Sequence, residues 1–326
     1  MKLQILVPQY KETEDIIKPL LDSIEIQQAV DLKNDVGVII VNDGTDVILS
    51  NDFLNRYTYK IEYHLAEHNG VSATRNRCLD FATADYVMFC DADDMFYNAC
   101  GLYIIFRDIN GDGFDTFSSI FIEESREQET NKPLYINRER DSTFVHGKVH
   151  RRQFLIDNNI RWNDSLTIHE DSYFNCLCQK LSKKFKYCPT SFYLWKWRDD
   201  SVCRHDPKYI LKTYNNLLDS NEALIDQFIS RDKENIAQFY AVSMIYDAYF
   251  TMNKDEWLNQ ENHNYRMHVE HRFAKYWKKY KELHDNAPTD IKNNIIVGIR
   301  NRMYKEGMIL ETQTFGEWIK IIEALE

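Results

Sequence analysis

Hydrophobic and polar positions alternate in blocks over the first third of the chain. Apolar runs with the length of buried strands lie at residues 3–7, 36–41, 59–64 and 86–90. Between them, apolar residues recur with helical spacing at 13–24 and 71–84. Nearly continuous apolar strands that alternate with helices indicate a mostly parallel sheet covered on both faces.

The pattern changes twice further along the chain. From residue 114 to residue 204, expected strands and helices are mixed, at 115–122, 151–158, 170–181 and 192–197. From Pro207 onward the strand signal disappears, and helical patterns cover 209–228, 233–252, 265–284, 291–304 and 315–325. The sequence therefore predicts an α/β domain over residues 1–206 and an all-helical C-terminal domain over residues 207–326.

Polar residues follow three of the expected strands at the point where each strand ends. They are Pro8, Gln9 and Tyr10, then Asn42, Asp43 and Gly44, then residues 91–94 (Asp-Ala-Asp-Asp). Ligands of such sheets bind beyond the carboxyl ends of the parallel strands. We therefore expect these residues to converge on one crevice.

The acidic run after the fourth expected strand is the strongest single signal. Asp91, Asp93 and Asp94 repel one another, so their ionised forms need a cation nearby. Oxygen ligands of this kind suit Mg²⁺ or Mn²⁺, which bind through one or two carboxylates together with substrate phosphates. The alternative is structural, with Asp93 or Asp94 capping the turn that follows.

Asp43 and Arg75 each allow a structural and a functional interpretation. Asp43 either belongs to an Asx turn or accepts hydrogen bonds from a base or ribose in the crevice. Arg75 lies where residues 68–76 run from a turn into a helix, a place that suits a phosphate. Arg75 either pairs with that phosphate through two hydrogen bonds or is an ordinary surface arginine.

Two downstream segments carry further candidates. Glu170 and Asp171 open a helix, where acids are favoured by the helix dipole, but either could also be a general base toward an acceptor hydroxyl. The sequence alone does not choose between them. Arg198, Arg204 and His205 form a cationic loop that is either hydrated or stabilises a departing diphosphate. His205 would also suit a metal shell.

Composition narrows the function classes. The chain has 326 residues, with 40 Lys and Arg against 51 Asp and Glu, for a net charge of −11. This balance opposes general binding to nucleic acids or anionic membranes. No apolar stretch is long enough to span a bilayer, so we expect a cytoplasmic protein. Residues 266–281 interleave basic and aromatic side chains, typical of an amphipathic helix and also compatible with a polyanion-binding surface.

Six motifs follow one another in the first 205 residues. They are residues 5–10 (ILVPQY), 41–46 (VNDGTD), 70–76 (GVSATRN), 86–94 (YVMFCDADD), 148–152 (KVHRR) and 169–171 (HED). In this order the motifs resemble family 2 glycosyltransferases of the GT-A fold, and the resemblance covers residues 1–205.

The resemblance implies a metal-dependent, inverting enzyme that takes a sugar from a nucleotide sugar, usually a UDP-sugar. It makes Asp171 the catalytic base, with Glu170 beside it. It implies that Asp93 holds Mn²⁺ or Mg²⁺ on the diphosphate, with Asp91 toward the ribose. The loop from Arg198 to His205 matches the segment that closes over the diphosphate. The residues expected at the donor nucleotide are Pro8, Tyr10, Asp43, Arg75, Asp91, Ala92, Arg198 and Arg204, and the expected metal set is Asp91, Asp93 and His205.

Acceptor and reaction class leave alternatives open. The acceptor is a glycan, a teichoic-acid-like or other surface polymer, a protein or a hydroxylated DNA base. The helical region is expected to bind that acceptor or to form a homo-oligomer. Two competing classes are a nucleotidyltransferase and a catalytically silent nucleotide-sugar-binding or assembly protein. Gln9, Lys11 and Asn42 depart from residues that are common in the family, which bears on the identity of the nucleobase.

Overall fold

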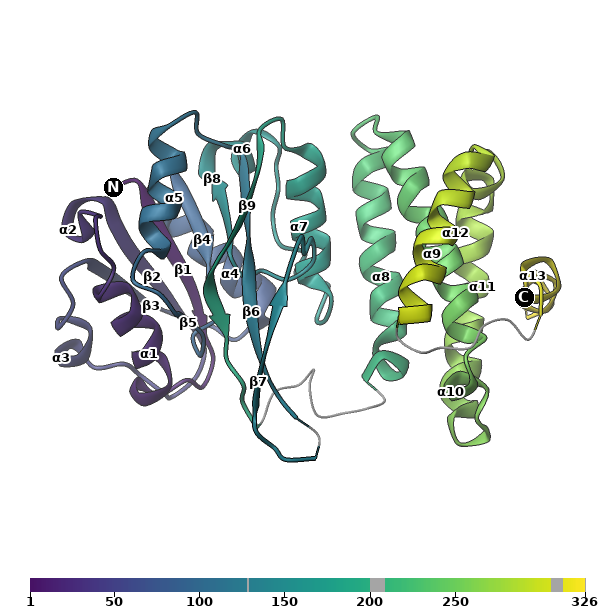
Figure 1. The fold of residues 1–326 in the computed structure, drawn as a ribbon, viewed down its shortest axis with the longest axis horizontal. Coiled ribbons are helices and arrows are strands. Elements are labelled where there is room, and N and C mark those ends of the chain that lie inside the picture. The colour runs from purple at the N-terminus through teal and green to yellow at the C-terminus, as the bar shows by residue number, and fades with distance from the viewer. Residues whose placement is uncertain (128, 200–208, 306–312, 326) are drawn as a thin grey trace. The chain divides into compact units, whose positions relative to one another are not determined.

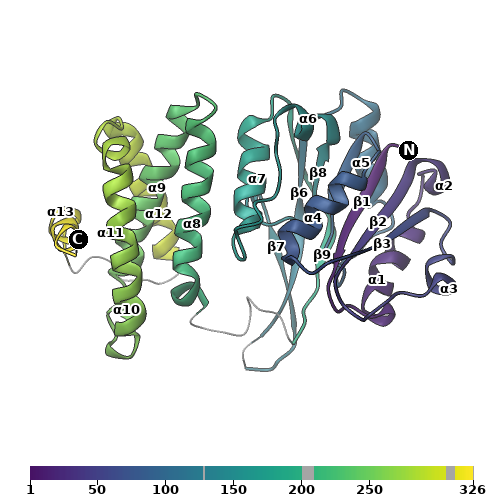
Figure 2. The same cartoon turned by 180° about the vertical axis from the view of Figure 1, so that it is seen from behind.

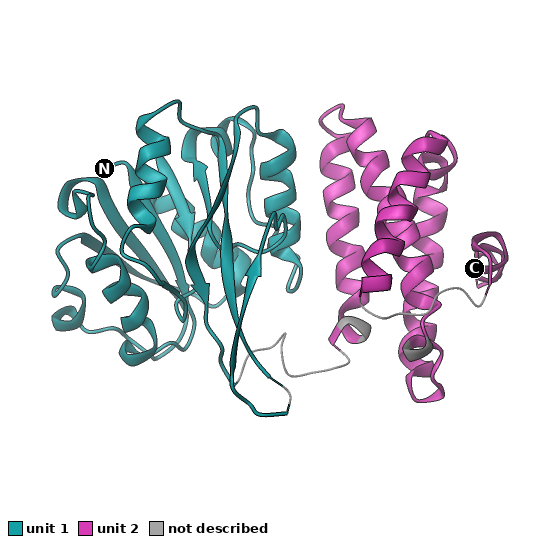
Figure 3. Ribbon diagram, viewed as in Figure 1, with its two compact units in different colours: residues 1–201 teal, residues 202–326 magenta. Residues whose placement is uncertain are grey.

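The computed structural model describes residues 1–127, 129–199, 209–305 and 313–325. Its contacts divide the chain into two compact units, residues 1–201 and 202–326 (Figure 3). The first unit is a mixed α/β fold, and the described part of the second is helical (Figure 1). The predicted fold class is therefore confirmed.

Parallel strands form one half of the sheet in the first unit. They are β1 (Leu3–Gln9), β2 (Val36–Asp43), β3 (Lys60–Ala66) and β4 (Tyr86–Phe89), in the spatial order β3-β2-β1-β4. The accompanying helices are α1 (Glu14–Glu25), α2 (Leu32–Asp35), α3 (Asn51–Leu54) and α4 (Gly70–Phe81). α1 covers one face and α4 the other (Figures 1 and 2), which buries the apolar runs of β1, β2 and β4 as predicted.

The other half of the sheet mixes strand directions. Its strands are β5 (Met95–Phe96), β6 (Thr116–Arg126), β7 (Pro133–Arg138), β8 (Lys148–Arg151) and β9 (Phe185–Trp195). β8 lies antiparallel between β4 and β6, β9 runs parallel to β6, and β7 pairs with β6 off the main path. The helices of this half are α5 (Gly101–Asn110), α6 (Arg152–Asp157) and α7 (Glu170–Leu181).

β7 and the first half of β9 escape the sequence pattern. β7 is mostly exposed, so no apolar alternation marks it, and its pairing with β6 defines it. β9 begins at Phe185, ahead of the strand expected from residue 192. The apolar pattern breaks at Pro189, which cannot donate a ladder hydrogen bond and lies where the register with β6 shifts.

The second unit is built from helices that agree closely with the predicted ones. They are α8 (Tyr209–Ile229), α9 (Glu234–Met252), α10 (Asp255–Leu258), a 3₁₀ turn η1 (Gln260–Asn262), α11 (His263–Asp285), α12 (Thr289–Lys305) and α13 (Phe315–Glu323). In the part of the chain that the structure describes, none of the helices has both the length and the apolar character needed to cross a membrane.

α11 contains the basic and aromatic segment singled out in the sequence. Phe273, Tyr276 and Trp277 are buried within the helical unit. On the outer side, Arg272 pairs with Asp219 at 2.7 Å and Lys279 with Asp226 at 3.1 Å. The segment is therefore an amphipathic helix whose cations are partly neutralised by neighbouring acids.

The side chain of Gln4 in β1 is hydrogen-bonded to residues just before β4, and a substitution there measures how much this link stabilises the fold. Its buried side-chain oxygen accepts hydrogen bonds from the backbone N–H groups of Thr83 and Ala84, at 2.7 and 2.8 Å. Gln4→Leu leaves both donors unpaired, so the free energy of unfolding should fall by about 3 kcal/mol. Urea denaturation measures the change. The control Gln153→Leu, at an exposed helix position, should stay within about 0.5 kcal/mol of the wild type. An equal stability of Gln4→Leu and wild type would contradict the prediction.

Candidate active site

Asp43, the last residue of β2, is tied to the loop that opens α4. Its carboxylate accepts hydrogen bonds from the backbone N–H of Asn69 (2.9 Å) and of Gly70 (3.0 Å). It also contacts Nδ1 of His68 at 2.9 Å. The Asx turn expected here belongs to Asn42, whose Oδ1 accepts from Thr45 N at 2.8 Å. Asp43 is buried and acts first as an anchor for the N-terminus of α4.

His68, which contacts Asp43, forms an exposed aromatic pair with Tyr10. His68 stacks on Tyr10, with ring centroids 4.9 Å apart and an interplanar angle of 26°. Both rings are exposed at the carboxyl ends of β1 and β2, and Nζ of Lys11 lies 4.8 Å from the Tyr10 ring centroid. We call the stacked pair of Tyr10 and His68 the platform. Gly44 allows this approach, because its φ is +72° and a Cβ there would lie 2.4 Å from the backbone nitrogen of His68. Sequence reasoning missed His68, which precedes the 70–76 motif.

Arg75 lies inside the fold, not on the surface. Its guanidinium donates hydrogen bonds to Asp91 (2.9 Å), Glu170 (3.0 Å) and Asp171 (2.8 Å), and it lies 4.4 Å from the ring centroid of Trp162. Burial favours loss of its proton, but the three carboxylates hold the pKa of Arg75 above its usual value. The structure thus brings together residues from the motifs at 70–76, 86–94 and 169–171. The contact between Arg75 and a phosphate stays a prediction.

Asp171 is the carboxylate best suited to acid–base chemistry. One oxygen accepts from Arg75, and the other accepts from the backbone N–H of Val145 at 3.2 Å. Burial raises the pKa of Asp171 to about 7, Glu170 and Asp91 add to the rise, and Arg75 opposes it. A carboxylate with a pKa near neutrality can exchange a proton at physiological pH. The role of Asp171 as the base stays a prediction.

The three aspartates after β4 have different surroundings. Asp91 faces Arg75, which overcomes the effect of burial and holds the pKa of Asp91 below its usual value. Asp93 pairs with Arg198 at 3.1 Å, and Arg198 also reaches Glu12 at 3.4 Å. Burial and the charge of Asp91 raise the pKa of Asp93. The sequence analysis included Arg198 among the residues expected at the donor, but it did not include Glu12.

Asp94 is the structural member of the acidic run. It is fully buried and accepts hydrogen bonds from the Tyr193 hydroxyl (2.7 Å) and from the backbone N–H of Lys196 (2.9 Å). These contacts fix the start of the loop after β9 against the acidic run. The alternative in which Asp94 caps the turn that follows it is wrong, because its donors come from β9 and from the loop after β9.

Among the described residues, the group that could hold a divalent cation is not the predicted pair of Asp91 and Asp93: it joins Asp91 to His146 and to Asp94, which also makes the structural contacts above. Ligand atoms of Asp91, Asp94 and His146 lie within 4.8 Å of one another. In the described part of the chain, Nδ1 of buried His146 has no hydrogen-bond partner, although it lies 3.4 Å from Asp94. Burial lowers the pKa of His146 to about 3, which keeps the imidazole neutral. Carboxylates suit Mg²⁺ and Mn²⁺. His205 and Arg204, expected at the metal and the donor, lie outside the described residues.

Pro8 and Ala92 occupy supporting positions. Pro8 lies in β1 opposite Val41, one residue before the strand ends. Ala92 lies between Asp91 and Asp93 in the sequence. Its side chain is buried and belongs to the hydrophobic core. Neither presents a polar side chain, so their expected part in donor binding is limited to shape and backbone contacts.

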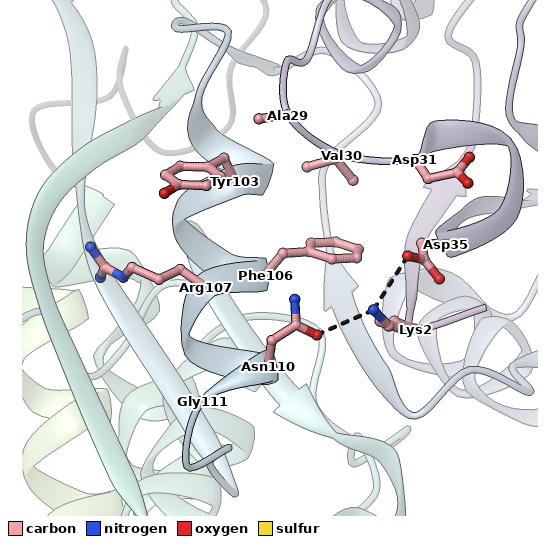
Figure 4. A pocket seen from close by; sticks show the side chains of 10 residues that line it. All are labelled: Lys2, Ala29, Val30, Asp31, Asp35, Tyr103, Phe106, Arg107, Asn110 and Gly111. Carbon is pink, nitrogen blue, oxygen red and sulfur yellow. Dashed lines mark hydrogen bonds and ion pairs between the residues drawn. The ribbon is translucent and has the colours of Figure 1, made fainter.

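A depression of about 440 Å³ lies at the other end of the parallel strands, beside the starts of β1 and β2 (Figure 4). Lys2, just before β1, pairs there with Asp35 at 3.4 Å and donates to Asn110 at 3.2 Å. Tyr103 and Phe106 of α5 also line it. The depression lies beside the amino ends of β1 and β2, so it is separate from the polar residues gathered at their carboxyl ends.

The sequence profile described as "Glycosyl transferase family 2" matches residues 4–173, more than half of the chain. The chain belongs to glycosyl transferase family 2. The family assignment inferred from the motifs is therefore confirmed. The match includes Asp43, Arg75, Asp91 and Asp171 and ends inside α7.

Named relatives agree with this family. The chain is 25% identical over 265 residues to the minor teichoic acid biosynthesis protein GgaB of Bacillus subtilis, covering 74% of this chain and 28% of that protein. The chain spans less than two thirds of the length of each of the first curated relatives that it matches.

Solved structures share the fold. A fragment of Staphylococcus aureus TarS in complex with UDP-GlcNAc superposes with a TM-score of 0.62 at 15% identity, covering 94% of this chain and 92% of that one. A mannosyltransferase of Pyrobaculum calidifontis, in complex with GDP-Man and Mn²⁺, gives 0.51 at 13% identity, covering 99% and 84%. At such identities the likeness shows the fold alone.

Arg75 is predicted to be essential for the stability of this carboxylate cluster. Arg75→Leu leaves three partly buried acids without their counter-charge, so the free energy of unfolding at pH 8 should fall by about 3 kcal/mol. The loss should shrink toward pH 4.5, because removing the cation raises the carboxylate pKa values and protonation then relieves the repulsion. Chemical denaturation at both pH values measures this. Arg77→Leu is the control, because Arg77 lies on the same helix and donates to the carbonyl of Glu67, outside the carboxylate cluster. A loss independent of pH would contradict the electrostatic account.

Proposed function

We propose that this chain is a metal-dependent, inverting glycosyltransferase that moves a sugar from a UDP-sugar to an acceptor hydroxyl. The observation that carries the proposal is the ion-pair cluster around Arg75. This cluster links Asp171, a carboxylate with a pKa of about 7, to Asp91 of the Asp-Ala-Asp run. A base and an anion- or metal-binding group within one cluster are what transfer from a nucleotide sugar requires.

The donor would extend along the carboxyl edge of the sheet. The platform formed by Tyr10 and His68 offers ring faces for a nucleobase, since every base has a π face. Asp91 and Asp93 would hold Mg²⁺ or Mn²⁺ near the diphosphate, and Arg198 would contribute positive charge beside Asp93. UDP and UDP-GlcNAc are ligands of the structural neighbour TarS, which supports uracil as the base.

Asp171 would perform the proton transfer. It takes the proton of the acceptor hydroxyl while that oxygen forms a bond to the anomeric carbon. The bond from the anomeric carbon to the diphosphate oxygen breaks with its electron pair, and attack from the opposite side inverts the configuration. When bound, the metal ion supplies Lewis-acid stabilisation of the departing diphosphate. Arg75 and Val145 hold the two oxygens of Asp171, so the base is oriented before the acceptor arrives.

We further propose a glycan or polyol-phosphate polymer as acceptor. GgaB is named for minor teichoic acid biosynthesis, and other relatives are named poly(ribitol-phosphate) glycosyltransferases. A hydroxylated DNA base is less favoured, because Arg272 and Lys279 of α11 are paired with acids and the chain is acidic overall. We assign the helical unit to acceptor binding or self-association.

The pH dependence of donor turnover tests this function. With Mn²⁺ and a UDP-sugar, release of UDP should rise about tenfold per pH unit below pH 7 and level off above it, because only ionised Asp171 accepts a proton. Asp171→Asn should lower kcat by about 10²- to 10⁴-fold with little change in Kd for UDP. A metal chelator should abolish release.

The control is Asp157→Asn, which changes a carboxylate at the end of α6. It should turn over the donor like the wild type. A catalytically silent binding protein would bind UDP without releasing it from any UDP-sugar, and a nucleotidyltransferase would release pyrophosphate from a nucleoside triphosphate. Either result would refute the proposed function, as would a flat profile from about pH 5.5 to 8.5.

A further inference from the structure

Lys148, the first residue of β8, is a buried lysine without an assigned role. Only 4% of the residue is exposed, so its ammonium group cannot reach a substrate in the crevice. Burial lowers the pKa of Lys148, while Asp141 and Asp171 act to raise it. A buried ammonium group is costly unless its hydrogen bonds are made inside the protein. Its partners therefore indicate what it does.

These partners all belong to the segment that precedes β8. Nζ of Lys148 donates to Oδ1 of Asp141 at 3.2 Å and to the backbone carbonyl of Phe144. The Asp141 carboxylate also accepts from the backbone N–H groups of Thr143 (2.9 Å) and Phe144 (2.8 Å). Lys148 and Asp141 thus close residues 141–145 into a compact loop, which we call the 141–145 loop.

The 141–145 loop is fastened to the helix that carries the base. Asn175 of α7 donates to the carbonyl of Thr143 at 2.8 Å. At the end of the loop, the backbone N–H of Val145 donates to Oδ2 of Asp171 at 3.2 Å. The carbonyl that Lys148 holds belongs to Phe144, so the peptide unit it fixes is the one that contains this N–H. Lys148 therefore acts directly on the group that orients Asp171.

We propose that Lys148 is a positioning residue for glycosyl transfer: it fixes the Phe144–Val145 peptide so that the Val145 N–H holds Asp171 toward the acceptor. This inference rests on the proposed function, because it assigns to Asp171 the role of base. Arg75 holds Oδ1 from α4, and the 141–145 loop holds Oδ2 from the other side. Two donors on opposite oxygens leave one orientation for the carboxylate.

Lys148 also contributes charge. The charged groups that face Asp171 are Arg75 from α4, Asp91 after β4, Glu170 from α7 itself and Lys148 from β8. The interaction between Lys148 and Asp171 is reciprocal, so the ammonium group favours the ionised base. Removing it should move the acid limb of the pH profile to higher pH.

The test compares Lys148→Met with Arg151→Met. Arg151 lies on the same strand and pairs with Asp115 at 2.7 Å, so its loss removes an ion pair that does not touch the 141–145 loop. Lys148→Met should lower kcat about 10- to 100-fold, leave Kd for UDP unchanged and shift the acid limb upward. Amide hydrogen exchange in peptides covering residues 141–147 should become faster. Arg151→Met should change none of these.

Asp141 provides the second variant if Lys148→Met does not fold. Asp141→Asn keeps an acceptor oxygen but removes the charge that Lys148 pairs with, so it should produce the same changes at smaller size. Unchanged kcat per folded molecule, or unchanged exchange at 141–147, in a folded variant overturns the inference. If the wild type releases no UDP, the proposed function fails, and the exchange comparison alone then decides whether Lys148 holds the loop.

Discussion

The crevice depends on one buried cation that neutralises carboxylates from distant parts of the chain. Arg75 faces Asp91, Glu170 and Asp171, three negative charges against one positive charge. Burial raises the pKa of Asp171 to about 7, and the charges of Glu170 and Asp91 add to that rise. The surplus of negative charge supports the proposed binding of a further cation.

The sheet explains why these groups meet. β1, β2 and β4 are parallel, so the polar residues after them lie on one edge, and α4 begins at that edge through its bonds to Asp43. β8 then enters antiparallel beside β4 and brings the loop before it toward α7. The aromatic pair, the acidic run and Asp171 therefore lie toward the carboxyl ends of the parallel strands, while the depression beside Lys2 lies toward their amino ends.

Sequence reasoning succeeded where a local pattern determines structure. The buried runs of β1 and β2 and the start of α7 follow from apolar periodicity and flanking residues, and the acidic run marked the crevice. It failed where a role depends on distant partners. Arg75 contacts Asp171 across 96 positions, so a surface arginine and a buried hub have the same local signature. The roles of His68, His146 and Lys148 were not predicted for the same reason, because each role depends on the surroundings of the side chain in the folded chain.

A structure of the chain with UDP and Mn²⁺, in which the metal is located by its anomalous scattering, tests the central claim most directly. The account predicts Mn²⁺ on the carboxylates of Asp91 and Asp93, with the diphosphate beside it, the base on the platform of Tyr10 and His68, and Asp171 facing the open side. Mn²⁺ or UDP bound at the Lys2 depression, or a crevice that stays empty at saturating ligand, would contradict it.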